Sequence, residues 1–146
     1  MLKIYTEDKK MTHQHLEHYE QAAVVEWAIQ QEHTYPDLKM LFAIPNAARR
    51  SLRQGAWMKA EGMKAGVPDL CLPVPVDHPC DKDGAFPDAV LHYNGLFIEM
   101  KSDKGKPTPE QQWWLFTLEA TYGYKTEICH SADEAIKVIK CYLRIS

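Results

Sequence analysis

The chain alternates between long stretches with helical periodicity and short stretches that are continuously apolar. Leu16, Ala23 and Trp27 recur at helical steps and predict a helix over residues 12–33. The same periodicity predicts two later helices, over residues 109–120 and 132–143. Each of these amphipathic segments needs an apolar surface against which to pack.

Four short apolar runs predict strands, over residues 39–44, 69–72, 96–101 and 124–129. The Asn94-Gly95 pair predicts a hairpin turn that joins residues 89–93 to residues 96–101. Residues 73–88 are rich in proline and aspartate, which favours a loop. The order of elements predicts one α/β domain over residues 1–146, with helices flanking a small mixed central sheet.

The composition narrows the class of protein. Of 146 residues, 45% are hydrophobic and 25% are charged, as in soluble globular domains. The net charge of −3 excludes a histone-like polycation, so contact with nucleic acid needs a local basic patch. None of the cysteines forms a Cys-x-x-Cys pair, which argues against a zinc ribbon. No apolar run suits a membrane span or a signal peptide, and we expect a cytoplasmic protein.

Two charged residues close the run at 96–101. Side chains alternate between the faces of a strand, so Glu99 and Lys101 share one face. Taken alone, this pattern is also typical of a solvated strand end with an ion pair. Asp69 favours another interpretation, because adjacent strands would bring Asp69 and Glu99 together.

Two close carboxylates repel each other unless a cation neutralises them. Mg²⁺ suits such a pair, since it takes only one or two carboxylates and keeps several waters. The backbone carbonyl of Met100 is a further candidate ligand. A metal held by Asp69 and Glu99 can polarise a phosphate and activate a water, and Lys101 can stabilise the developing charge. The chemistry that fits is hydrolysis of a phosphodiester bond.

Glu20 falls on the apolar stripe of the helix predicted over residues 12–33. A carboxylate that faces the sheet is costly unless it is paired or coordinates a ligand. Alternatively the stripe is broad, and Glu20 lies on its solvated margin.

Three motifs occur in order, namely Gly66-Val67-Pro68-Asp69, Ile98-Glu99-Met100-Lys101 and Thr108-Pro109-Glu110-Gln111. Together they resemble the VRR-NUC family, the virus-type replication–repair nucleases of the PD-(D/E)xK superfamily. The resemblance runs from about Glu20 to Tyr142 and is to stand-alone domains of phage or bacterial type. It implies a nuclease core with the element order αβββαβ, followed here by a C-terminal helix.

The resemblance implies roles for the matching residues. The implied metal ligands are Asp69 and Glu99, with Glu20 as an additional ligand, and the implied catalytic residues are Asp69, Glu99, Lys101 and Gln111. Gln111 also has a structural interpretation, because Thr108 and Gln111 have the spacing of a helix capping box with Pro109 between them. Both roles of Gln111 can hold.

A basic segment precedes the first motif. Residues 47–65 carry five positive charges and one negative charge, and this segment is expected to be helical or partly mobile. The stretch from Ile44 to Arg50 also resembles the family. The candidate DNA-binding residues are Asn46, Arg49, Arg50, Arg53, Lys64 and, after the catalytic strand, Lys104. A solvated helix face is the alternative interpretation of the segment.

We therefore predict a DNA endonuclease that depends on Mg²⁺ or Mn²⁺. Stand-alone members of the family resemble Holliday-junction resolvases, which implies a branched DNA substrate. Symmetric cutting of a four-way junction needs two active sites and hence a homodimer. The alternatives are a nuclease of linear duplex DNA and a non-catalytic DNA-binding module on the same fold.

Two features lie outside this assignment. The loop at 73–88 is longer than the hairpin connection usual in the family, and it can contact DNA, contact a second subunit or be a surface insertion. Trp113 and Trp114 point about 100° apart on their helix, so one is expected in the core. The other is a candidate anchor for DNA or for dimerisation.

Overall fold

The computed structural model describes residues 13–45, 51–79 and 90–146. The helices are α1 (His13–Gln31), the short 3-10 helix η1 (Pro36–Met40), α2 (Leu52–Ala60), α3 (Pro109–Ala120) and α4 (Ala132–Leu143). The strands are β1 (Phe42–Ala43), β2 (Leu70–Leu72), β3 (Val76–Pro79), β4 (Val90–Tyr93), β5 (Leu96–Met100) and β6 (Lys125–Cys129).

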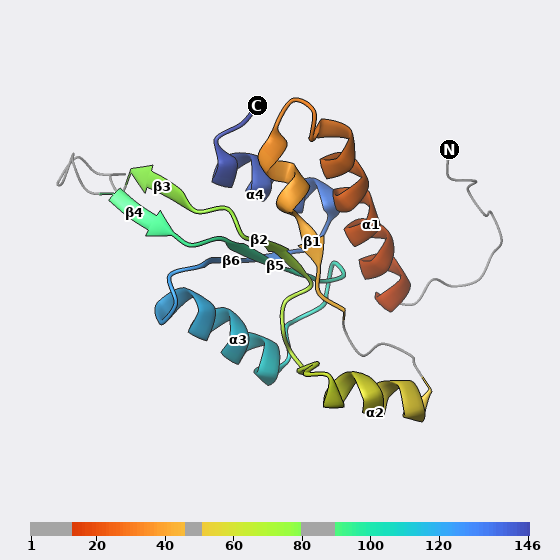
Figure 1. Cartoon of the computed structure of the whole chain (residues 1–146). Coiled ribbons are helices and arrows are strands. Elements are labelled where there is room, and N and C mark those ends of the chain that lie inside the picture. Colours follow the sequence, from red (N-terminus) through yellow and green to blue (C-terminus); the bar gives the residue numbers. More distant parts are fainter. Residues whose placement is uncertain (1–12, 46–50, 80–89) are drawn as a thin grey trace, which may run out of the picture.

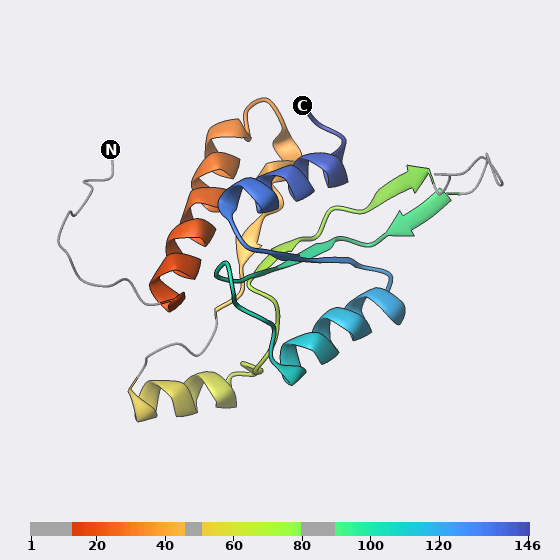
Figure 2. The ribbon, with the colours of Figure 1, turned by 180° about the vertical axis from the view of Figure 1, so that it is seen from behind.

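These elements form three layers around a mixed sheet (Figure 1). The strand order is β1-β2-β5-β6, in which β5 pairs antiparallel with β2 and parallel with β6. The helices α1 and α4 cover one face of the sheet and α3 covers the other, as the view from behind also shows (Figure 2). The predicted α/β class, with a small mixed sheet between helices, is confirmed.

The larger core lies between the sheet and the pair α1 and α4. Its buried sheet residues are Leu70, Leu72, Leu96, Ile98 and Met100, and its buried helix residues include Val24, Ala28, Ala135 and Ile139. Each fully buried aliphatic side chain stabilises the fold by roughly 1.5–3 kcal/mol relative to exposure. The strand register pairs Leu70 with Ile98, so the apolar side chains of β2 and β5 meet on this face. The alternate residues of β5 therefore point toward α3.

The strand predicted over residues 39–44 is largely wrong. Residues Pro36–Met40 form η1, and only Phe42 and Ala43 pair with β2. Proline at the start of η1 fixes a helical φ, and burial of Leu38 holds the turn in place. Local turn chemistry thus outweighs the short apolar run.

The hairpin turn predicted at Asn94-Gly95 is also wrong. The chain continues there from β4 into β5, with β4 pairing with β3 and β5 pairing with β2. The backbone N–H of Asn94 donates to the carbonyl of Gly123, and its side-chain amide donates to the carbonyl of Tyr122. A Cβ at Gly95 would lie 2.9 Å from the carbonyl oxygen of Leu72, so glycine permits a close approach of two strands.

Part of the loop predicted at 73–88 is ordered as a strand. Residues Val76–Pro79 form β3, which builds a two-stranded ribbon with β4, while residues 80–88 lie outside the described residues. The ribbon extends from the end of β2 and the start of β5, away from α2 (Figure 1). Pro73 and Pro75 cannot donate to a ladder, which separates the ribbon from the sheet. Within the described ranges, no helix has both the length and the apolar character to span a membrane.

Gly66 fixes the turn that leads into β2. Its φ is +82°, and an added Cβ would lie 2.8 Å from the backbone carbon of Glu110 at the start of α3. Only glycine combines this backbone conformation with such a close approach. The turn and the first residues of α3 are therefore packed backbone against backbone.

We expect Gly66→Ala to lower the free energy of unfolding by roughly 1–3 kcal/mol, since it adds strain and a clash. Urea denaturation followed by circular dichroism measures this loss. Gly62→Ala is the matched control, because its φ is +102° but nothing lies within 4 Å of the added Cβ. Equal losses in the two variants would show that packing against Glu110 contributes nothing.

Candidate active site

Glu99 and Lys101 form a buried pair at the end of β5. Glu99 has no exposed surface, and Lys101 is 9% exposed. Nζ of Lys101 donates to Oε1 of Glu99 at 2.6 Å. The predicted shared face is thus observed, and the alternative of a solvated strand end is wrong because the first turn of α3 adjoins this face.

Asp69 lies beside this pair, just before β2. The antiparallel register that pairs Leu70 with Ile98 sets Asp69 opposite Glu99. Oδ2 of Asp69 accepts a hydrogen bond from the backbone N–H of Met100 at 2.8 Å. Adjacent strands therefore bring the two acids together, as the sequence predicts, and a backbone contact fixes one of them to the sheet.

The surroundings raise the pKa of Glu99 to about 7. Loss of hydration on burial is the largest cause, and the negative charge of Asp69 adds to it. The hydrogen bond and positive charge of Lys101 lower the pKa, while the charge of Glu17 makes a smaller contribution that raises it. Near neutral pH, the fold thus holds a carboxylate whose negative charge is only partly offset.

One oxygen of this carboxylate lacks a partner. Oε2 of Glu99 is buried, and no hydrogen bond reaches it from the described residues. Such an atom is costly in a protein interior, and a hard divalent cation is a partner that carboxylate oxygens accept. Across residues 13–45, 51–79 and 90–146, no three His, Cys, Asp or Glu side chains form a ready cation site. Mg²⁺ does not require three, because waters complete its shell around one or two carboxylates. The donors present fit such an ion.

Gln111 makes both of the contacts that the sequence suggests. Oε1 of Gln111 accepts from the backbone N–H of Thr108 at 2.8 Å, and the Thr108 hydroxyl accepts from the backbone N–H of Gln111. This capping box starts α3. Nε2 of Gln111 also donates to Oε1 of Glu99, so the same side chain joins the helix to the site.

The first helix brings a different acid to this place than the sequence indicates. Oε2 of Glu20 accepts from the backbone N–H of Ala132, at the N-terminus of α4. Glu17, three residues earlier, lines the same cleft as Asp69 and Glu99, and its Oε1 accepts from the backbone N–H of Ser102 at 3.0 Å. The structure brings Glu17 to the site and directs Glu20 to a helix end.

A cleft of about 680 Å³ opens over these residues. It lies between α1, the segment that leads into β2, and the start of α3, and its basic lining residues are Lys59, Lys64 and Lys101. Acids and lysines that line one cleft suit a phosphate group that meets a cation.

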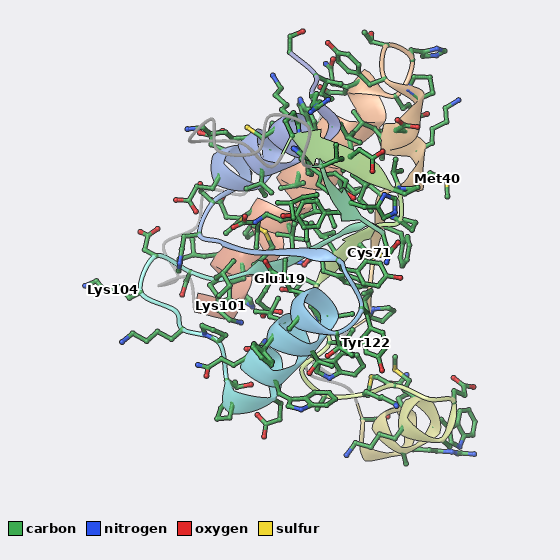
Figure 3. The ribbon with its side chains drawn as sticks, turned by 90° about the vertical axis from the view of Figure 1, so that its left-hand side faces the viewer. Met40, Cys71, Lys101, Lys104, Glu119 and Tyr122 are labelled. Carbon is green, nitrogen blue, oxygen red and sulfur yellow. The ribbon has the colours of Figure 1, made fainter. Side chains whose placement is uncertain are left out.

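The remaining candidate DNA-binding residues do not line this cleft among the described residues. Asn46, Arg49 and Arg50 lie outside the described residues. Arg53 is on the exposed face of α2, with its guanidinium carbon 4.9 Å from the ring centre of Trp57. Lys104 extends into solvent from the loop after β5, whereas Lys101 lies against the sheet (Figure 3).

Sequence reasoning missed Glu17 as a site residue. Glu17 and Glu20 are one turn apart on α1, and periodicity alone favours Glu20 because it falls on the apolar stripe. The feature that distinguishes the two acids is the strand end that each one faces. This feature depends on the parallel pairing of β5 with β6, which the sequence does not reveal.

Comparisons with known proteins agree with this fold. A sequence model of the VRR-NUC domain matches residues 5–133, which is most of the chain. Among solved structures, the chain is similar to one described as a VRR_NUC domain protein, with 26% sequence identity and a TM-score of 0.65. That similarity covers 90% of each chain. No curated protein matches the chain.

We expect Glu99→Gln to gain stability relative to the wild type as the pH rises from about 5 to about 8 without metal. The pKa of Glu99 is raised from 4.5 to about 7, so between these values the folded wild type holds a proton that the unfolded chain has lost. Wild-type stability therefore falls across this window, and a glutamine does not titrate. The stability difference should change by on the order of 3 kcal/mol.

Urea denaturation at several pH values in EDTA measures this difference. A difference between the two proteins that stays constant with pH would contradict the raised pKa.

Proposed function

The chain belongs to the VRR-NUC family of PD-(D/E)xK nucleases, and on this premise we propose that it is a metal-dependent endonuclease that cuts branched DNA. The observation that carries the proposal is the buried Glu99–Lys101 pair opposite Asp69, with one oxygen of Glu99 left without a hydrogen bond. A purely structural ion pair would have no need of a second acid beside it.

Asp69, Glu99 and the backbone carbonyl of Met100 are the proposed ligands of Mg²⁺ or Mn²⁺. We assign the additional ligand of the first helix to Glu17 and not to Glu20. The support is that Glu17 lines the cleft and raises the pKa of Glu99 through its charge. When bound, the cation would neutralise these carboxylates and polarise the scissile phosphate.

Lys101 and Gln111 are the proposed catalytic side chains beside the ligands. Lys101 can donate a hydrogen bond to a phosphate oxygen or to the attacking water, where negative charge develops. Its pairing with Glu99 holds Nζ at that position before a substrate arrives. Gln111 donates to the same oxygen of Glu99, which fixes the orientation of the carboxylate.

The proposed path of the DNA backbone follows the basic residues around the cleft. Lys59 and Lys64 line it, and Lys104 and Lys106 line a neighbouring hollow that includes Lys101. Arg53 on α2 is a more distant contact. Asn46, Arg49 and Arg50 stay predictions from the sequence alone.

The branched substrate, the homodimer and a single catalytic domain over residues 1–146 are parts of this proposal. A four-way junction has two equivalent strands to cut, so two copies of this domain would supply two sites. Linear duplex DNA is the second candidate substrate, because the same acids and lysine suit any phosphodiester bond. A non-catalytic DNA-binding module would have no use for a buried lysine beside two acids.

Variants at the two acids of α1 should differ in their affinity for a metal ion. We expect Glu17→Ala to weaken binding of Mn²⁺, measured by calorimetry, whereas Glu20→Ala should leave Mn²⁺ affinity unchanged. Glu17→Ala should also lower metal-free stability by roughly 1–2 kcal/mol, because it removes a charged acceptor from the backbone N–H of Ser102. Glu20→Ala is the matched variant one turn away, and it should lower metal-free stability by roughly 1–2 kcal/mol because it removes a charged acceptor from Ala132. Unchanged Mn²⁺ affinity in Glu17→Ala would remove Glu17 from the ligand set.

Cleavage of a labelled four-way junction, beside a linear duplex of the same sequence, tests the function itself. We expect cutting with Mg²⁺ or Mn²⁺, none with EDTA, and a loss of about 100-fold or more in Lys101→Ala. The assay is best run near pH 8.5, where Glu99 is ionised even though its pKa is raised.

Junction-selective cutting would establish a resolvase-like enzyme. Equal cutting of both substrates would keep the nuclease and discard the preference for branches. Binding without cutting under either metal would leave the non-catalytic module.

A further inference from the structure

Helix α3 carries a large aromatic side chain that lines a hollow next to the cleft. Trp113 is 59% exposed, although most of a tryptophan is usually buried. Its ring meets that of Trp114 edge to face, with centroids 5.4 Å apart and an angle of 81° between the planes. Such a contact orients the ring while leaving much of it open to solvent.

Trp114 is in turn fixed to the neighbouring segment. Its indole N–H donates to the backbone carbonyl of Ala65 at 3.1 Å, next to the close packing of Gly66 on Glu110. The position of Trp113 therefore follows from contacts that also hold the segment leading into β2. Few rotamers would be lost when Trp113 meets a ligand, which lowers the entropic cost of binding.

The exposed ring lines a hollow that shares two lining residues with the cleft. The hollow is lined by Ala65, Pro109, Glu110, Trp113 and Trp114, and the cleft also includes Ala65 and Glu110. Gln111, which contacts Glu99, precedes Trp113 by two residues, so the two side chains point about 200° apart on the helix. The relation of the hollow to the site therefore rests on the lining residues that the two spaces share. The hollow thus lies close to the candidate active site.

The charges of the two spaces differ. Among the described residues, the hollow is lined by one charged side chain, Glu110, and by no lysine or arginine. The cleft is lined by lysines and acids together, namely Lys59, Lys64, Lys101, Glu17, Asp69, Glu99 and Glu110. Glu110 disfavours a phosphate in the hollow, whereas the lysines of the cleft, with a cation held by its acids, would favour a phosphate there. An uncharged aromatic base suits the hollow, because stacking on an indole needs no counter-charge.

We propose that this hollow is a stacking site for an unpaired base of the DNA substrate, with the indole of Trp113 as its platform. The proposal rests on the proposed nuclease function and specifies its substrate class: DNA in which bases beside the scissile phosphate are unpaired. A base within an intact duplex is stacked on its neighbours and cannot present its face to the indole.

Trp57 on α2 is equally exposed, but its surroundings differ. The guanidinium group of Arg53 lies over its ring, 4.9 Å from the centroid. That cation occupies one face of the indole, and Trp57 lines a separate hollow from the cleft. The geometry therefore assigns base stacking to Trp113.

The test compares two DNAs in EDTA, where no cutting occurs. One is a blunt duplex, and the other is the same duplex with splayed single-stranded arms that carry 2-aminopurine at the first unpaired position. We expect Trp113→Ala to weaken binding of the armed DNA by about tenfold or more and of the blunt duplex by less than about twofold. The quenching of 2-aminopurine on binding should be lost as well.

Two matched variants separate stacking from loss of surface. Trp113→Phe keeps an aromatic face and should restore much of the arm preference and the quenching. Phe116→Ala removes an aromatic ring that is 71% exposed on the same helix but lines neither space, and it should behave as the wild type.

Equal effects of Trp113→Ala on both DNAs, or no effect on either, would overturn the inference. A change from dimer to monomer in sedimentation, with arm preference intact, would overturn it in favour of an interface between copies. Metal-dependent cutting by a wild type without arm preference would overturn the inference alone. Quenching that depends on Trp113 in a protein that never cuts would support the inference and end the nuclease proposal.

Discussion

The burial of the Glu99 carboxylate is the constraint on which the surrounding structure depends. A carboxylate without exposed surface must find donors or lose its charge. Lys101 from the same strand and Gln111 from α3 both donate to one oxygen, which leaves the other oxygen for a ligand. Because Gln111 also caps α3, the start of that helix and the orientation of the carboxylate depend on each other. The charge of Asp69, which lies opposite, makes a negative charge on Glu99 still less favourable. A cation bound between the two carboxylates would relieve this repulsion.

The two acids of α1 show how the fold holds this strand end in place. Glu17 accepts from the backbone after β5, and Glu20 accepts from the backbone after β6. Since β5 and β6 are parallel neighbours, their ends lie side by side, and one turn of helix spans both. Two acids at this spacing on α1 therefore hold the ends of both strands, next to the candidate site. The division of roles between Glu17 and Glu20 is a matter of which strand end each faces.

Much of this arrangement could be predicted from the sequence, because it depends on local rules. The helices over 109–120 and 132–143 follow from periodicity and caps, and the shared face of Glu99 and Lys101 follows from strand alternation. The predictions that failed depend on distant contacts. Asn94-Gly95 has the chemistry of a hairpin turn, but the loop at Tyr122 and Gly123 binds it in an extended course. Local periodicity favours Glu20 over Glu17, and only tertiary pairing shows which of the two acids reaches the site.

The break between the central sheet and the β3–β4 ribbon has a consequence for how this protein can diverge. Prolines after β2 and the Asn94-Gly95 segment before β5 interrupt the hydrogen-bond ladder on both strands. A residue inserted in the ribbon would change the pairing of β3 with β4. The change would stop at the interruption, so the pairing of β2 with β5 would stay as it is. The alignment of Leu70 with Ile98, and with it the approach of Asp69 to Glu99, is insulated from such changes. The ribbon is therefore the part of the fold in which length and sequence can vary among relatives while the chemistry of the site is kept.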